Sequence, residues 1–327
     1  MFFICTAISF INGGAFFGRS LDFEHGFGES IVFMPRRFLL RFREMPENRS
    51  HHAVIGTAFV NEGYPLFYDG MNEHGLFAAG LNFPKSAVYK PKNECSYNIA
   101  PFEFIPWILA ECADINEAKS KIEHANILST DFSKDLSSTP LHWFIADKNS
   151  SLAVEPTAKG LMIHENPVGV LTNEPPFEYQ LMNLSNFLSI SPYEPESRFF
   201  EKFKTTPYSR GMGGLGLPGD LSSSSRFVRA AFVKSNSLSG KTEEENVTQF
   251  FHILGSVEQP EGCVRLKNGD LERTIYSCCI SSESKVFYYR SYENSRITAV
   301  DMKKENAESN LLVSYPFLKK QDILFQN

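Results

Sequence analysis

The chain has 327 residues, of which 42% are hydrophobic and 21% charged, and its formal net charge is −6. This length can bury a substantial core, in one large domain or two ordinary ones. The acidic balance argues against a nucleic-acid-binding protein, because such proteins usually present a basic face. The thirty phenylalanines would suit an apolar ligand pocket, although most of them are expected in the core.

The N-terminal stretch MFFICTAISF does not read as an export signal. No Lys or Arg precedes the apolar residues, and Thr6, Ser9 and Asn12 interrupt them. No segment approaches the roughly 18 consecutive apolar residues that a membrane span needs. The six cysteines match neither a zinc pattern nor a CxxC redox motif, which favours reduced thiols. We therefore expect a cytoplasmic protein with no metal, no cofactor and no membrane association.

Short apolar or alternating runs, most of them ended by Gly, Pro or Asn, predict strands in the first part of the chain. They cover residues 5–10, 15–23, 30–35, 38–43, 53–60, 65–70 and 76–83. The first two runs flank INGG, which is typical of a tight hairpin. A helical region follows at 100–128. Asp114 and Glu117 resemble a capping box within it, so two consecutive helices are expected.

The second half repeats this order. Strands are expected at 141–147, 151–157, 160–165 and 169–176, and loops from about 185 to 224. Helices are expected at 222–236 and 242–257, where Thr242 and Glu245 form another capping box. The final strands are predicted at 273–281, 285–292 and 295–302.

This alternation of strand and helix blocks favours an α+β architecture of antiparallel sheets covered by helices. With no internal repeat and no long linker, residues 1–327 are expected to form a single domain. The match to GxGxxG at 211–216 lacks the preceding strand and following helix that a dinucleotide site requires. We therefore reject a nucleotide cofactor.

The candidate chemistry lies at the start of the chain. The sequence contains no GxSxG, HExxH or P-loop motif, and its eight histidines are scattered; His142, beside Trp143, is interpreted as a satisfied strand residue. A cysteine at a chain terminus needs no histidine, because its own α-amine titrates near pH 8 and can act as its base. In the predicted hairpin, Arg19 and Asp22 return beside Cys5 and could stabilise the thiolate and orient the amine. Taken alone, these two residues are better explained by a surface ion pair on a hairpin.

Several blocks together resemble the choloylglycine hydrolase family, and in particular the bile salt hydrolases of Gram-positive gut bacteria. In chain order they are CTAISF…FFGRSLDFE, DGMNEHGLFAAGLNFP, GVLTNEPPFEYQL, GMGGLGLPGDLSSSSRFVRAAF and FFHILGSVEQ, and they span essentially the whole chain. The resemblance implies a four-layered αββα fold with two antiparallel sheets, that of the N-terminal nucleophile hydrolases. It also implies hydrolysis of the amide that joins a bile acid to glycine or taurine.

The resemblance assigns six catalytic positions. Cys5 corresponds to the nucleophile, Arg19 to the residue that steadies its thiolate, and Asp22 to the residue that holds its α-amine. Asn82 and Asn173 correspond to polar contacts of the scissile carbonyl and its oxyanion. Arg226 corresponds to a residue that orders this network. The sterol body is expected in an apolar pocket formed by loops after the early strands and by the Gly-rich region 208–222, and the family implies a homotetramer.

The sequence departs from the bile salt hydrolases in what precedes the cysteine. There the cysteine follows the initiator Met, whereas here MFFI precedes Cys5, and Phe2 makes Met1 a poor substrate for methionine aminopeptidase. We therefore expect residues 1–4 to be a short leader removed by self-cleavage at Ile4–Cys5. A misassigned start is the simpler alternative.

Two other functions remain open at this stage. Asn82 favours bile salts over penicillin V, because the related penicillin V acylases typically carry Tyr there, yet a penicillin V or N-acyl homoserine lactone acylase of the same family is the alternative enzyme. The alternative outside catalysis is an inactive apolar-ligand-binding homologue in which Cys5 stays blocked.

Overall fold

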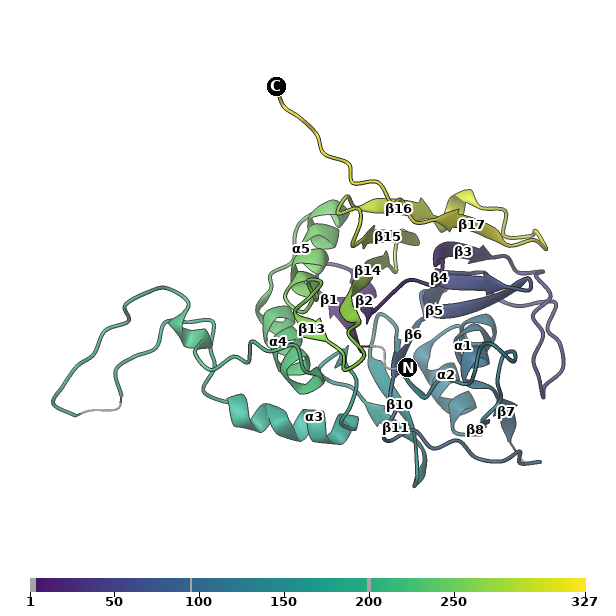
Figure 1. Ribbon diagram of the computed structural model, residues 1–327, viewed down its shortest axis with the longest axis horizontal. Helices are drawn as coiled ribbons and strands as arrows, with labels where there is room; N and C mark the ends of the chain where they lie inside the picture. Colours follow the sequence, from purple (N-terminus) through teal and green to yellow (C-terminus); the bar gives the residue numbers. More distant parts are fainter. Residues whose placement is uncertain (1–3, 95, 199–200) are drawn as a thin grey trace.

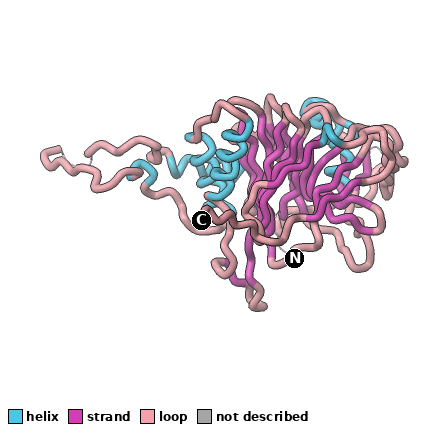
Figure 2. The backbone as a smooth tube through the Cα atoms, turned by 90° about the horizontal axis from the view of Figure 1, so that it is seen from above, coloured by secondary structure: helices cyan, strands magenta, loops and turns pink. Residues whose placement is uncertain are grey.

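The computed structural model describes residues 4–94, 96–198 and 201–327. Two antiparallel sheets stack face to face, and helices cover their outer sides (Figure 2). This arrangement confirms the α+β sandwich expected from the sequence. Residues 1–3 of the predicted leader lie outside the described part, and Ile4 begins the first strand.

The first sheet carries the start of the chain. Its strands are β1 (Ile4–Ile11), β2 (Ala15–Phe23), β12 (Val170–Leu171), β13 (Val264–Arg265), β14 (Leu271–Ser281), β15 (Val286–Ser291) and β16 (Thr298–Asp301). Over the described residues they run in the order β12-β1-β2-β14-β15-β16, and β13 pairs with β14. The predicted hairpin joins β1 to β2, with Gly13 in the left-handed region at φ +68°. Cys5 therefore lies on an inner strand, next to β2.

The second sheet runs β11-β10-β9-β6-β5-β4-β3-β17. Its strands are β3 (Ser30–Met34), β4 (Val54–Asn61), β5 (Tyr64–Asn72), β6 (Phe77–Asn82), β9 (Leu141–Ala146), β10 (Ser151–Thr157), β11 (Gly160–Glu165) and β17 (Val313–Pro316). A separate parallel pair is formed by β7 (Tyr97–Ile99) and β8 (Ala125–Ile127).

The helices form the two outer layers (Figure 1). They are α1 (Phe104–Glu111), α2 (Ile115–Ile122), α3 (Phe177–Asn183), α4 (Ser223–Asn236) and α5 (Glu243–Gly255), with short 3-10 turns η1 (Pro101–Glu103), η2 (Leu184–Phe187), η3 (Met212–Gly214) and η4 (Met302–Lys304). Helices α4 and α5 pack on the first sheet, and α1 packs on the second. Among the described residues, no helix has the length and apolarity needed to cross a lipid bilayer.

Aromatic side chains join the two sheets. Phe17 of β2 stacks on Phe77 of β6 with ring centroids 5.8 Å apart, and Phe77 contacts Phe144 of β9 edge to face at 6.3 Å. All three are completely buried, so this contact stabilises the sandwich through both burial and ring geometry. These phenylalanines thus pack in the core, as expected from the sequence for most of them.

The two helix starts predicted from capping residues are found in the structure, where side-chain oxygens accept the free backbone N–H groups of the first turn. Asp114 caps α2 by accepting the N–H groups of Asn116 and Glu117, and Thr242 with Glu245 forms the predicted capping box of α5. The Glu117 side chain, however, accepts from Ala113 rather than completing a box with Asp114.

The predicted strand at 38–43 is wrong. Pro35 follows β3, and the only strand-like pairing in this run is a single bridge between Leu40 and Asn48. Phe38 and Phe42 pack against the core below the second sheet without a neighbouring strand. Their apolarity therefore reflects packing rather than sheet pairing.

Candidate active site

Cys5 lines a cavity of about 400 Å³ between the two sheets. The thiol is 1% exposed, and most of the surrounding side chains are apolar. The lining includes Cys5, Arg19, Leu21, Phe27, Phe59, Leu66, Phe67, Tyr68, Asn82, Phe102, Phe132, Leu136 and the segment 137–141. The expectation that 208–222 forms part of this wall is wrong: among the described residues, the lining comes from the early strands, from 101–102 and from 132–141. Residues on either side of η3 lie on an excursion between α3 and α4 that reaches away from the sandwich (Figure 1).

Arg19 sets the charge of this cavity. Its side chain is buried on β2, and Nη1 donates to the carbonyl oxygens of Gly80 at 2.6 Å and Tyr68 at 3.2 Å. The other terminal nitrogen, Nη2, is buried without a hydrogen-bond partner. Burial raises the pKa of the Cys5 thiol, and the positive charge of Arg19 is the largest effect that opposes this rise. Arg19 is therefore placed to favour a thiolate.

Asn173 and Arg226 hold the backbone at Cys5. The Cys5 N–H donates to Asn173 Oδ1 at 2.9 Å, and Arg226 Nη1 donates to the Cys5 carbonyl oxygen at 2.6 Å. Arg226 Nη2 also donates to Asn173 Oδ1 at 2.8 Å. Asn173 Nδ2 in turn donates to the Asn82 carbonyl oxygen at 3.0 Å. The structure thus joins Cys5, Asn82, Asn173 and Arg226 in one network.

Asp22 lies opposite Ile4 in the ladder between β1 and β2. Its carboxylate accepts from Thr274 Oγ1 at 2.5 Å, and burial raises its pKa to about 6 against the opposing charge of Arg226. In this chain the Cys5 nitrogen is an amide that bears Ile4. The predicted contact between Asp22 and a free α-amine therefore stays a prediction.

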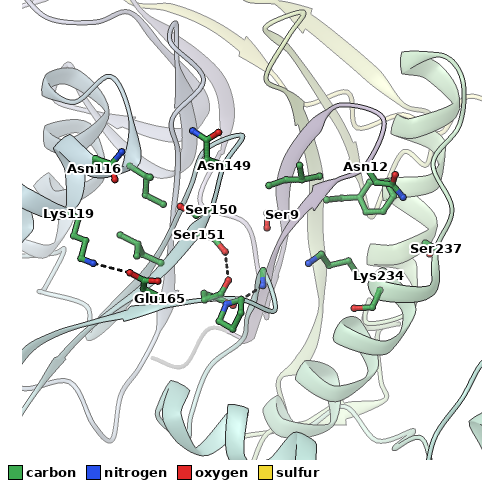
Figure 3. A pocket seen from close by; sticks show the side chains of 18 residues that line it. Ser9, Asn12, Asn116, Lys119, Asn149, Ser150, Ser151, Glu165, Lys234 and Ser237 are labelled. Atoms are coloured by element: carbon green, nitrogen blue, oxygen red, sulfur yellow. Dashed lines mark hydrogen bonds and ion pairs between the residues drawn. The ribbon is translucent and has the colours of Figure 1, made fainter.

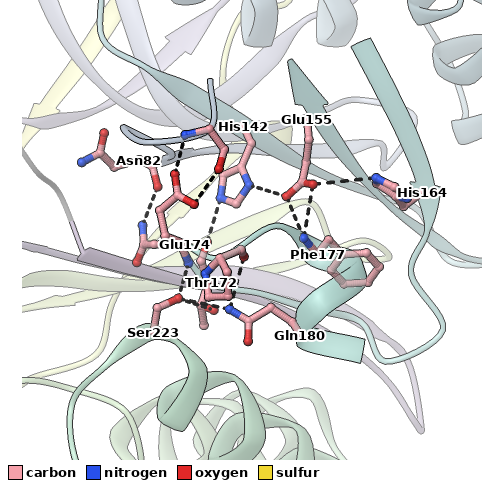
Figure 4. Close-up of polar contacts among 12 residues, drawn as sticks. Asn82, His142, Glu155, His164, Thr172, Glu174, Phe177, Gln180 and Ser223 are labelled. Atoms are coloured by element: carbon pink, nitrogen blue, oxygen red, sulfur yellow. Dashed lines mark hydrogen bonds and ion pairs between the residues drawn. The ribbon is translucent and has the colours of Figure 1, made fainter. Parts of the chain in front are cut away.

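A buried polar cluster supports the segment that carries Asn173 (Figure 4). His142 Nε2 lies 2.8 Å from the Thr172 carbonyl oxygen, and His142 Nδ1 lies 3.0 Å from Glu155 Oε1. Glu155 also accepts the N–H of Phe177. Both His142 and Glu155 are buried, so they fix the backbone on either side of Asn173 rather than reach the cavity. The interpretation of His142 as a satisfied strand residue is confirmed.

Several groups around Cys5 were not found from the sequence. The carbonyl oxygens of Tyr68 and Gly80 hold Arg19, and Ser223 Oγ accepts the Asn173 N–H at 2.9 Å. Backbone carbonyls have no side-chain signature, and Ser223 is one of four consecutive serines. Only the fold distinguishes these groups.

A second, polar cavity of about 560 Å³ lies at the other end of β1 (Figure 3). Ser9 and Asn12 line it together with α2, β10 and the end of α4. Its cations have partners: Lys119 pairs with Glu165 at 3.1 Å, and Lys234 Nζ donates to the Val168 carbonyl oxygen. Burial lowers the pKa of Lys234 to about 8. This cavity has no cysteine among its described lining residues.

One group of described residues has the donor atoms for a metal ion, and it lies apart from both cavities. His52 Nδ1 and His74 Nε2 are 3.0 Å apart beside Glu73. The Glu73 carboxylate, however, is held by Arg36 and by the N–H of Ala53. Because Glu73 already accepts these hydrogen bonds, only the two imidazole rings of the group lack such partners from Arg36 and the backbone.

The sequence and the fold match known proteins along nearly the whole chain. Residues 5–315 match the linear amide C–N hydrolases of the choloylglycine hydrolase family. A relative named bile salt hydrolase/transferase, from Lactiplantibacillus plantarum, is 49% identical over 96% of this chain and 97% of its own. Another of that name, from Clostridium perfringens, is 35% identical over 98% of this chain and 99% of its own.

The crystal structure of a Cys-to-Ala mutant of the conjugated bile acid hydrolase from Clostridium perfringens has a TM-score of 0.92. That chain is 34% identical, and the match covers 99% of this chain and all of that one. A penicillin V acylase from Agrobacterium tumefaciens, 22% identical with a TM-score of 0.75, shares the fold. This chain belongs to the choloylglycine hydrolase family of enzymes that hydrolyse linear amide C–N bonds.

Proposed function

We propose that this enzyme hydrolyses the amide of glycine- and taurine-conjugated bile salts, with Cys5 as an N-terminal nucleophile. The observation that carries the proposal is the cavity between the sheets, where one buried thiol beside an arginine opens into a largely apolar wall. An apolar wall suits a sterol body, and a cation near the thiol suits amide cleavage. The curated relatives named for bile salts support this substrate class.

The residues have the following proposed roles. The α-amine of Cys5 takes the thiol proton, and the thiolate, favoured by Arg19, attacks the amide carbon. Asn82 and Asn173 donate to the oxyanion of the tetrahedral intermediate. The α-ammonium, oriented by Asp22, returns its proton to the departing amine of glycine or taurine, which leaves an acyl thioester. Water, deprotonated by the same amine, then hydrolyses the thioester and releases the bile acid.

This chemistry requires that the residues before Cys5 be removed. An amide nitrogen has no basicity, so with Ile4 attached Cys5 would lack its proposed base. We propose self-cleavage of the Ile4–Cys5 bond by the Cys5 thiol. We further propose that the chain forms a single domain and is cytoplasmic, and, from the family resemblance, that it assembles as a homotetramer.

The test compares the natural chain with Cys5→Ala, using glycocholate and taurocholate as substrates and the intact mass of each protein as a second measurement. We expect the natural chain to begin at Cys5 and to release glycine and taurine. Cys5→Ala should keep its leader and lose at least about 10⁴-fold in kcat/KM, because loss of a nucleophile removes covalent catalysis. Cys263→Ala, which removes an exposed thiol, is the matched control and should behave like the natural chain.

Three outcomes would contradict the proposal. Full activity with Ile4 still attached would exclude the α-amine as the base. Faster cleavage of penicillin V than of either bile salt would favour an acylase of that type. Bile salt binding without turnover in a chain that retains its leader would indicate a blocked, ligand-binding homologue.

A further inference from the structure

The two asparagines proposed to hold the oxyanion come from different sheets. Asn82 is the last residue of β6 in the second sheet, and Asn173 follows β12 of the first. Their relative position therefore depends on contacts that cross from one sheet to the other. One such contact is the hydrogen bond from Asn173 Nδ2 to the Asn82 carbonyl oxygen at 3.0 Å. The side chain of Glu174, the next residue, makes another.

The Glu174 carboxylate reaches from the segment of Asn173 to the loop that follows Asn82 (Figure 4). Oε1 accepts the N–H groups of Lys85 and Ser86, both at 2.8 Å. Oε2 accepts the Ser86 hydroxyl, also at 2.8 Å. Hydrogen bonds to a carboxylate are stronger than those between neutral groups. Glu174 thus joins two loops whose contacting residues are 88 and 89 positions apart in the chain.

The residues of this contact lie outside the cavity that contains Cys5. Glu174, Lys85 and Ser86 are absent from its described lining, whereas Asn82 is part of it. Glu174 is therefore placed to act on the reaction through other residues rather than by touching the substrate.

The segment that carries Glu174 is itself tied to the nucleophile. Asn173 Oδ1 accepts the Cys5 N–H at 2.9 Å and Arg226 Nη2 at 2.8 Å. Glu174 thus holds the loop after Asn82 against a segment whose position relative to Cys5 is already set. The position of Asn82 relative to Cys5 follows from this contact.

We propose that Glu174 is a positioning residue for the oxyanion site: its carboxylate holds the loop after Asn82 at a fixed distance from the segment of Asn173. The inference rests on the proposed function, because it needs both asparagines to be oxyanion donors. Such donors act best when they are in place before the charge develops. Loss of the carboxylate should loosen Asn82 but leave the Cys5 thiol and the apolar wall as they are.

The first test is steady-state kinetics on glycocholate, with kcat expressed per molecule that begins at Cys5 by intact mass. A misplacement of about 1 Å in a reacting geometry can cost about 100-fold in rate, so we expect Glu174→Ala, which loosens the loop without removing its other contacts, to lower kcat about tenfold. KM should change by less than about twofold, because the apolar wall keeps its residues. Glu174→Gln keeps an oxygen that accepts both backbone N–H groups, so its kcat should lie within about threefold of the natural value.

Two further measurements separate positioning from general damage to the fold. Because Glu174 acts through Asn82, Glu174→Ala should lower kcat by less than about twofold in a chain that already carries Asn82→Ala. Alkylation of Cys5 by iodoacetamide needs the thiol but no oxyanion donor. Its rate in Glu174→Ala should therefore stay within about twofold of the natural rate.

Glu283→Ala is the matched control for a glutamate that joins two turns. Its carboxylate accepts the N–H of Ala15 at 3.2 Å, at the hairpin end of β1 and β2 and away from Cys5. We expect this variant to keep the natural kcat and KM. Ser86→Ala removes one of the three hydrogen bonds to Glu174 and should lower kcat about two- to threefold, so it replaces Glu174→Ala if that variant fails to fold.

An unchanged kcat in Glu174→Ala, or in Ser86→Ala where it takes its place, would overturn the proposal. So would losses from Glu174→Ala and Asn82→Ala that multiply in the double mutant, or alkylation that slows as much as kcat falls. If the natural chain fails to hydrolyse glycocholate, the proposed function is wrong; if it turns over and these variants match it, only the role of Glu174 is wrong.

Discussion

The two cavities at the ends of β1 have opposite characters. Four positions separate Cys5 from Ser9, about 13 Å along a strand, yet the first end opens into an apolar cavity and the second into a polar one. The polar cavity is the larger, at about 560 Å³ against about 400 Å³. Size therefore does not distinguish the cavity that contains Cys5.

The cations in the two cavities differ in whether all their nitrogens have hydrogen-bond or ion-pair partners. In the polar cavity Lys119 is paired with Glu165 and Lys234 with a carbonyl oxygen, so the cations there are already satisfied. In the apolar cavity Arg19 keeps one buried nitrogen without a partner. A buried guanidinium with an unpaired nitrogen favours the thiolate form of a nearby cysteine more strongly than a cation that is already paired. We therefore expect Cys5, which lies near Arg19, to be more reactive than any group in the polar cavity.

The largest expected effect at the apolar end, after loss of Cys5 itself, comes from Asn82→Ala. If the Asn82 side chain donates to the oxyanion, kcat for glycocholate should fall about 100- to 1,000-fold with a smaller change in KM. Steady-state kinetics on the processed enzyme measure this. An unchanged kcat would remove Asn82 from the proposed oxyanion site.

A smaller effect is expected from the apolar wall. Leu136→Ala removes three carbon atoms that line the cavity, so KM for taurocholate should rise about five- to tenfold while kcat changes little. Leu311→Ala, at a site 70% exposed, is the matched control and should leave both constants unchanged. A selective loss of kcat in Leu136→Ala would contradict a pure binding role for this wall.

The smallest effect on turnover is expected at the polar end, from Lys234→Met, which should keep kcat/KM within about twofold. This variant should instead change stability. The pKa of Lys234 is about 8 in the fold and about 10.5 in the unfolded chain, so below pH 8 the fold bears the full cost of a buried charge.

Between pH 8 and 10.5 the folded protein releases this proton first, and that cost disappears. Lys234→Met should therefore raise the free energy of unfolding by about 1–2 kcal/mol at pH 7, after allowance for the lost hydrogen bond, and the gain should fade toward pH 10.5. Urea unfolding at pH 7 and pH 10 measures it. A gain that grows with pH would contradict the assignment.

The features predicted correctly from the sequence are those set by a few neighbouring residues, such as turns and helix caps. The β1–β2 hairpin follows from INGG, and the starts of α2 and α5 follow from Asp114 and Thr242. The run at 38–43 failed because apolar residues that pack below a sheet look the same as residues within one. The helical prediction for 100–128 is wrong at its end, where β8 forms a strand that pairs with β7. Helix α3, β7, β13 and β17 were not predicted at all.

The candidate site was predicted through family resemblance rather than through pattern. No sequence pattern near Asn173 or Arg226 predicts that both contact Cys5, because each contact joins residues more than 160 positions apart. The wall at 132–141 was missed because it lies in a segment between strands that carries no motif.

The hydrogen bond from Arg226 to the Cys5 carbonyl oxygen limits when the site can form during synthesis of the chain. The two residues are 221 positions apart, so a nascent chain still lacking α4 on the ribosome cannot assemble the network that holds Cys5. If removal of the residues before Cys5 needs this network, synthesis of the chain through α4 must precede their removal. Products that end before α4 would then keep these residues, and loss of the N-terminal peptide would mark chains in which α4 has already packed against β1.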